Sequence, residues 1–282
     1  MTKSNLVYRL SGWVNKAAIS LVLGVYALIA IYPIFYTLIA SFKTRKGFAD
    51  NPFNIPLDPT LSNYVEAFSR LHLGRLLLNS FITTAGGVVL VTIVSIMAAY
   101  AVTKLRFRGA NIVFLVIVGT LMIPNQTVMY PLYQTVYAMG LINTHLGLIL
   151  AFGAFGLPLG TYLIAAYFKS VPTELVEAAV VDGANHFQIL WRVMLPIAMP
   201  AVVSVGILNS VWMWNDLLLP LLLVSGRDSQ TLMVAISLFR GQYDVFVPLI
   251  SAGLIIGMLP VITIYLVAQT QLIKGLTAGA VK

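Results

Sequence analysis

The longest stretch without Asp, Glu, Lys or Arg is residues 109–168, GANIVFLVIVGTLMIPNQTVMYPLYQTVYAMGLINTHLGLILAFGAFGLPLGTYLIAAYF. It is far longer than the roughly 20 apolar residues that cross a bilayer as one helix. Gly140, Asn143, Thr144 and His145 interrupt it with turn-forming and polar side chains. We therefore expect two membrane-spanning helices here, joined by a short turn.

Four more apolar runs flank this stretch and are bounded by charged residues. A charged side chain at the centre of a membrane helix costs roughly 2.5 to 3.5 kcal/mol, so gaps between charges mark candidate spans. Only Asp216 falls inside one of the four runs, which are residues 17–42, 76–103, 198–223 and 245–273. The first run is nearly twice as long as the apolar part of a secretory signal, which predicts an uncleaved anchor.

The composition agrees with six membrane spans. The 282-residue chain is 59% apolar and 9% charged, whereas soluble proteins carry about 25% charged residues. An even number of spans places both termini on one side, and ten of the 17 Lys and Arg residues fall on that side. Basic residues favour the cytoplasm, so we expect a multi-pass protein with cytoplasmic termini. The basic residues form no cluster typical of nucleic-acid binding.

Several catalytic classes are excluded by missing residues. The chain has no cysteine and therefore no disulfide, thiolate metal site or cysteine nucleophile. No G-x-x-x-x-G-K-[ST] phosphate loop or G-x-S-x-G elbow occurs. Its three histidines, His72, His145 and His186, are far apart and form no H-E-x-x-H zinc pair. We expect no catalytic residue, metal or cofactor in this chain.

Residues 169–196 lie between the fourth and fifth predicted spans and hold three of the nine acidic residues. Ser170 and Thr173 are candidate N-caps of a first helix, and Gly183 would end it. Asn185 followed by Gln188 has the spacing of a capping box, which predicts a second helix before Pro196. The pattern indicates a helix-turn-helix outside the membrane. A simple connector between two spans is the alternative.

The string EAAVVDGA at residues 177–184, with Leu-Pro at 195–196, resembles the EAA loop of permease subunits in binding-protein-dependent ABC importers. The resemblance implies a cytoplasmic coupling helix that docks on an ATPase subunit. Glu177 would then make polar contacts with the ATPase, and Gly183 would form the turn. Other ATPase-coupling residues implied in the same loop are Ala178, Ala179, Asp182, Ala184 and Phe187.

The resemblance covers almost the whole chain and extends to the carbohydrate branch of the family. Trp214-Asn215-Asp216, the basic turn at residues 106–109 and the tail from Lys274 to Lys282 are similar to that branch. The implied fold has six transmembrane helices of the MetI/MalG-like ABC importer type. Residues 1–75 would form the N-terminal segment, first span and external loop, and residues 76–282 the permease core and C-terminal cytoplasmic tail.

The resemblance also implies a function and partners. The chain would be the non-catalytic permease subunit of an ATP-driven importer of a sugar or oligosaccharide in a bacterial or archaeal cytoplasmic membrane. Its implied partners are a second, MalF-like permease, an ATPase dimer that holds ATP and Mg, an extracytoplasmic solute-binding protein and membrane lipid. An ion-coupled secondary transporter of a small polar solute is the alternative, although such proteins usually carry repeats and several embedded charges.

Polar residues inside the spans are candidates for the translocation pathway or its gate: Asn125, Gln126, Asn215 and Asp216. Asn125 and Gln126 follow Pro124 in a span that we expect to be broken, where they either line the path or bond a neighbouring helix. Asp216 either faces the path or caps a helix broken near Pro220. Trp212 and Trp214 are expected in the aromatic belt at the membrane surface.

The loop between the last two spans, residues 225–244, is expected outside the membrane. By resemblance it contacts the solute-binding protein, through Arg227, Asp228, Arg240 and Tyr243. Glycine pairs inside the spans, Gly86 with Gly87 and Gly253 with Gly257, are expected to allow close helix packing.

Overall fold

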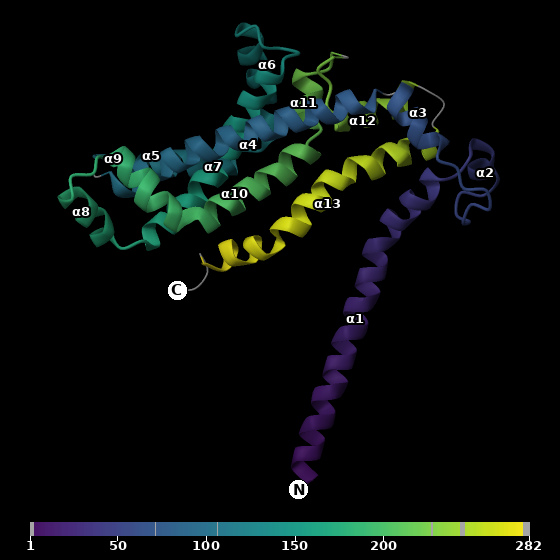
Figure 1. The fold of residues 1–282 in the computed structure, drawn as a ribbon, viewed down its shortest axis with the longest axis horizontal. Helices are drawn as coiled ribbons and strands as arrows, with labels where there is room; N and C mark the ends of the chain where they lie inside the picture. The colour runs from purple at the N-terminus through teal and green to yellow at the C-terminus, as the bar shows by residue number, and fades with distance from the viewer. Residues whose placement is uncertain (1–2, 71, 106, 227, 243–245, 279–282) are drawn as a thin grey trace. The chain divides into compact units, whose positions relative to one another are not determined.

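The computed structural model describes residues 3–70, 72–105, 107–226, 228–242 and 246–278 (Figure 1). All regular secondary structure in these ranges is helical. Five helices, and one pair of helices with a sharp bend between them, are long and apolar enough to cross a membrane, which matches the six predicted spans. The chain divides into two compact units, Met1–Leu71 with Tyr243–Ile256 and His72–Gln242 with Gly257–Lys282.

The first unit contains the first span and the folded loop that follows it. Helix α1 (Lys3–Ser41) carries the span, and its apolar side chains from residue 16 onward are mostly exposed. The predicted external loop holds two helices, α2 (Arg45–Asp50) and α3 (Ser62–Arg70). Asn63 anchors this loop to the end of α1, because its Nδ2 donates to the carbonyl oxygens of Ser41 at 2.8 Å and Lys43 at 2.9 Å.

The core of the second unit is formed by three long helices that pack side by side, α4 (Leu73–Lys104), α7 (His145–Ser170) and α10 (Leu195–Asn215) (Figure 1). Their buried apolar side chains include Val91, Phe152 and Val205. Glycines on α7 allow the close approach: a Cβ on Gly156 would lie 2.7 Å from Val91 Cγ2 and 2.5 Å from Asn209 Oδ1.

The third span is broken, as the sequence predicted. Helix α5 (Ala110–Gly119) continues into a 3-10 turn, η1 (Thr120–Met122), and a second 3-10 turn, η2 (Asn125–Val128), leads into α6 (Met129–Ala138). The two halves meet at an angle of 101°. The break lies at Ile123, whose ψ of 121° is extended because the residue before a proline is disfavoured in the α region.

The predicted turn between spans three and four is confirmed. Gly140 and Asn143 adopt positive φ angles of 69° and 61°. The side chain of Thr144 accepts a hydrogen bond from the Gly147 amide at 3.1 Å and so caps the start of α7.

The segment after α7 differs from the prediction in two ways. Neither predicted N-cap, Ser170 or Thr173, caps helix α8 (Thr173–Val181), because the N-cap position is Pro172, whose side chain cannot accept a hydrogen bond. Ser170 lies two residues earlier and donates its hydroxyl to the Tyr167 carbonyl. The predicted second helix is not separate. The short α9 (His186–Ile189) continues through a π-helical turn, η3 (Leu190–Met194), into α10, so the fifth span begins near His186 rather than at Ala198.

A physical reason for this continuity lies around Pro196. No glycine or proline separates Asn185 from Pro196, so nothing stops the helix before that residue. A proline nitrogen cannot donate the usual helical hydrogen bond, and the wider π turn directly precedes the position where that bond is missing. The capping box at the start of α9 is present as predicted, with reciprocal 2.9 Å bonds between Asn185 and Gln188.

The fifth span also ends earlier than predicted, at Asn215 rather than Leu223. A short helix, α11 (Leu218–Leu223), follows, and the expected external loop contains another helix, α12 (Leu232–Gln242). The last span is α13 (Val247–Ala278). Close packing is confirmed at Gly86, Gly87 and Gly257, where an added Cβ would lie within 2.8 Å of a neighbouring side chain, but is wrong for Gly253, which faces open space.

Candidate functional site

The segment from Val171 to Ile189, which we call the α8–α9 segment, projects beyond the ends of α7 and α10 (Figure 1). It is attached to the core by a few buried side chains, Val176 of α8 and Ile189 of α9 among them. Between the two helices the chain turns at Gly183, whose φ of 82° lies in the left-handed region that favours glycine. The predicted glycine turn is therefore present.

The outward surface of this segment combines acidic and apolar side chains. Glu177, Ala178, Asp182, Gly183 and Phe187 are exposed, and Ala179 and Ala184 are half-buried.

Four large apolar side chains on the same segment are also exposed, namely Leu175, Val180, Val181 and Phe187. Exposed apolar side chains gathered outside a membrane span are typical of a protein interface. Of these four side chains, only Phe187 is among the coupling residues predicted from the sequence.

The predicted pathway residues do not all lie together. Asn125 lines a cavity of about 700 Å³ between the broken third span and helices α7 and α10. Gln126 is exposed in η2 but is not among the residues that line it. Asn215 is exposed at the end of α10, where its Nδ2 donates to the Val211 carbonyl.

Asp216 lies at the interruption between α10 and α11. Its Oδ2 accepts a hydrogen bond from the Leu219 amide at 3.1 Å. The carboxylate thus binds a free amide at the start of α11, which is the capping geometry expected for a helix broken before Pro220.

The cavity contains polar side chains that the sequence analysis did not single out. Asn209 is 2% exposed and donates from Nδ2 to the Val205 carbonyl, while Thr120 and Thr135 also line the cavity. Trp212 lines it too and packs edge-on against Phe152 with ring centroids 5.7 Å apart. The sequence pattern that could have identified Asn209 is a single asparagine within an apolar run.

The two tryptophans lie in the last turn of α10, and each contacts another part of the protein. Trp214 is buried, and its indole nitrogen donates to the Gly257 carbonyl of α13 at 3.0 Å. Trp212 is half-buried at the cavity. Residues two apart lie on different faces of a helix, so the two tryptophans contact different neighbours, as predicted.

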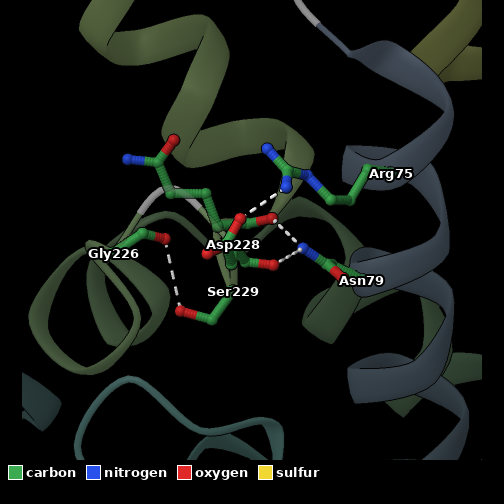
Figure 2. A network of polar contacts seen from close by, with 6 residues as sticks. Arg75, Asn79, Gly226, Asp228 and Ser229 are labelled. Carbon is green, nitrogen blue, oxygen red and sulfur yellow. Dashed lines mark hydrogen bonds and ion pairs between the residues drawn. The ribbon is translucent and has the colours of Figure 1, made fainter.

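The start of the predicted binding-protein loop is held against α4, as Figure 2 shows. Asn79 Nδ2 donates to the carbonyl oxygens of Asp228 and Gln230, both at 2.9 Å, and Arg75 forms an ion pair with the Asp228 carboxylate. The Asp228 side chain is 91% exposed, so its ion pair is largely screened by solvent and the amide bonds dominate.

Three further residues were predicted to contact the solute-binding protein through this loop. Arg227 and Tyr243 lie outside the described residues, and Arg240 belongs to the last turn of α12.

Comparison with known proteins gives consistent matches. A family profile described as "Binding-protein-dependent transport system inner membrane component" matches residues 76–278. The chain is 35% identical to the probable starch degradation products transport system permease protein AmyC of Thermoanaerobacterium thermosulfurigenes, over 92% of this chain and 94% of that one. It is also 35% identical to the trehalose transport system permease protein SugB of Mycobacterium tuberculosis, over 90% and 93%.

A solved structure matches as well. The structure is of a bacterial ABC transporter involved in the import of the acidic polysaccharide alginate. One chain of it superimposes with a TM-score of 0.78 at 27% identity, covering 96% of this chain and 98% of that chain.

Proposed function

This chain belongs to the family of binding-protein-dependent transport system inner membrane components, and from that membership we propose that it is the permease subunit of an ABC importer for a sugar or oligosaccharide. Its relatives named for starch products and trehalose support a carbohydrate substrate. The chain itself supplies helices and no catalytic group. Energy comes from ATP and Mg held by a separate ATPase dimer.

The observation that carries this proposal is the α8–α9 segment. It offers the exposed carboxylate of Glu177, a glycine turn at Gly183 and an apolar surface around Phe187, all outside the spans. A simple connector between two spans would leave Val180 and Val181 exposed to water with no stabilising contact, whereas a docked ATPase would bury them. We assign ATPase coupling to Glu177, Ala178, Ala179, Asp182, Gly183, Ala184 and Phe187.

The proposed mechanism is alternating access. Closure of the ATPase pair on binding ATP would displace the α8–α9 segment, and the spans attached to it would change from an inward-facing to an outward-facing arrangement. Hydrolysis would reverse the change. A second, MalF-like permease completes the pathway, and a solute-binding protein delivers the sugar from outside.

The wall of the pathway is assigned to the cavity beside the broken third span. Asn125, Asn209 and Trp212 give it two amides and one aromatic ring, which are groups suited to hydroxyls and to the apolar face of a pyranose. Gln126, Asn215 and Asp216 do not line this cavity, and a part in the gate of the pathway is proposed for them from the sequence alone. The assembled complex would contact the binding protein through the loop that holds Asp228.

The test is ATP hydrolysis in liposomes by the full complex, assembled from this chain, a partner permease, an ATPase and a solute-binding protein. We expect hydrolysis to rise when the binding protein is loaded with one of a panel of sugars. The double variant Glu177→Ala, Gly183→Asp should abolish the rise. The paired control is Glu66→Ala, which removes an acidic side chain from α3 instead.

Two outcomes would count against the proposal. If the four proteins assemble but no sugar stimulates hydrolysis, the carbohydrate assignment is wrong. If no ATPase associates with the wild-type chain, the coupling assignment is wrong and an ion-coupled transporter takes its place.

A further inference from the structure

Two side chains near the C-terminal end of α4 form hydrogen bonds with the α8–α9 segment, one before α8 and one at the start of α9. Lys104 donates from Nζ to the carbonyl of Val171 at 2.8 Å, and Val171 is the first of the two residues between α7 and α8. One helical turn earlier, the Tyr100 hydroxyl lies 3.2 Å from Nδ1 of His186, the first residue of α9. Two side chains of one helix therefore bracket the segment.

Tyr100 is also packed by its ring. The side chain is 4% exposed, and its ring meets Phe168 of α7 edge-on with centroids 6.5 Å apart. The centroid of the His186 ring lies 6.3 Å from that of Tyr100. The ring thus fills the space between the last turn of α7 and the first turn of α9, while the hydroxyl adds a directional bond to α9.

The charge of Lys104 makes a smaller contribution than its hydrogen bond. Partial burial lowers the pKa of this ammonium, and the negative charge of Glu174 in the first turn of α8 partly offsets that effect across solvent. The ammonium therefore holds the joint before α8 mainly through the Val171 carbonyl. A lysine can do this from the end of a span because its long apolar stem stays beside the helix.

These contacts join parts of the chain that are not adjacent in sequence. The α8–α9 segment is covalently continuous with α7 and with α10, but α4 is separated from it by the whole third span and α7. Packing of α4 on α7 along the membrane gives a general mechanical link. Tyr100 and Lys104 add a link at the point where a force from outside the membrane would enter.

We infer that Tyr100 and Lys104 are positioning residues that make α4 follow the α8–α9 segment when an ATPase displaces it. This inference rests on the proposed function of the chain as an importer subunit. The second span thereby responds to the ATPase directly, and not only through the helices on either side of the segment. Tyr100 holds the α9 end and Lys104 holds the α8 end.

The test measures coupling rather than activity alone. Wild-type and variant complexes are reconstituted in liposomes, and sugar uptake is divided by ATP hydrolysed in the same sample. Tyr100→Phe keeps the packed ring and removes the hydroxyl, while Lys104→Met keeps the stem and removes the ammonium. We expect the double variant to lower uptake per ATP about fivefold, the smallest factor typical of coupling between sites, with ATPase association retained.

Two matched variants separate positioning from stability. The single variant Lys104→Arg retains a cation that can donate to Val171 and should keep most of the wild-type ratio of uptake to ATP hydrolysed. Tyr130→Phe removes the hydroxyl that accepts a hydrogen bond from Gln134 within α6, away from the α8–α9 segment, and should leave the ratio unchanged. A merely structural role would lower the yield of complex, and uptake and hydrolysis would fall together with the ratio unaltered.

An unaltered ratio in the double variant, measured on a wild-type complex that transports sugar, overturns the inference and leaves the importer assignment standing. Absence of ATPase association or uptake in the wild type contradicts the importer assignment itself. The two failures are thus told apart by the wild-type sample.

Discussion

Lys43 organises the loop after the first span through a single buried cation. Its Nζ donates three hydrogen bonds, to the carbonyl oxygens of Asn51 at 2.9 Å and Pro52 at 2.8 Å and to Asn54 Oδ1 at 2.9 Å. Burial lowers the pKa of this ammonium from its ordinary value. Its three oxygen partners match the three donors of a protonated lysine, so the charge is solvated by the loop itself.

We therefore expect Lys43→Met to loosen this loop. The three oxygens lose their donor, and a net loss of about 1 kcal/mol raises the population of the opened loop roughly fivefold. Chymotrypsin cleavage at Phe53, measured in detergent, should accelerate by the same factor. Lys46→Met, which changes an exposed lysine of α2, is the control, and equal cleavage rates in the two variants would contradict the role given to Lys43.

Position 183 requires glycine because of its backbone conformation, and not because a side chain would lack space there. No atom lies within 4 Å of a Cβ added there, but the φ of 82° costs an L residue roughly 1 to 2 kcal/mol. We predict that Gly183→Val impairs ATPase association most, Gly183→Ala less, and Gly183→Asn least, because asparagine tolerates the left-handed region. Co-purification of the ATPase with each variant checks this order. Equal losses in all three would point instead to a role for the free space.

At the scale of elements, the interface between α4 and α7 depends on glycines at positions 153, 156 and 160. An added Cβ would lie 2.5 Å from Leu90 at Gly153, and near Ser95 at Gly160. These spacings of three and four residues place the glycines on one helix face. The helices can approach closely only because that face carries no side chain.

Gly156→Val should therefore destabilise the protein by about 1 to 3 kcal/mol, the usual cost of overpacking a filled interior. Thermal unfolding in detergent, followed by loss of monodisperse protein, provides the measurement. Gly24→Val is the matched control, since a Cβ at Gly24 of α1 meets nothing within 4 Å. A midpoint as low for the control as for Gly156→Val would mean that valine itself, and not the contact, is responsible.

At the scale of the whole molecule, six spans require that the loop after α1 and the α8–α9 segment lie on opposite sides of the membrane. The natural chain has no cysteine, so single cysteines can be placed without background. In cells that express this chain without the ATPase, we predict that Asp58→Cys reacts with a membrane-impermeant maleimide from outside intact cells, and that Asp182→Cys reacts only in inside-out vesicles. Both residues are exposed, and labelling of both from the same side would contradict the six-span topology.

The spans could be predicted because charged residues bound them, and the broken third span because Pro124 disfavours a helical residue before it. The turn at Gly183 and the capping box at Asn185 were likewise local features. Interactions between distant residues were not visible in this way. Nothing local indicates that Tyr100 meets His186, or that the buried Asn209 faces a cavity.

The boundary errors have the same origin. Pro196 was taken as the end of a separate helix, but it is absorbed in a continuing one. The fifth span was extended to Leu223, past the break at Asp216, although a break near Pro220 had been considered. Phe187 could be recognised from the sequence as part of an apolar helix face, but the pattern did not show that its side chain is exposed.

The continuous helix from His186 to Asn215 limits where a residue can be inserted or deleted. Adding or deleting one residue in an α-helix turns everything beyond it by about 100°, which would rotate Asn209 and Trp212 away from the cavity. The π turn at Leu190–Met194 is different, because its hydrogen bonds enclose one residue more than those of an α turn. Removing one residue there would let the turn close as an α-helix and keep the rest of the span in phase. Within this path, a one-residue deletion is therefore tolerable at the π turn and disruptive in the α-helical stretches on either side.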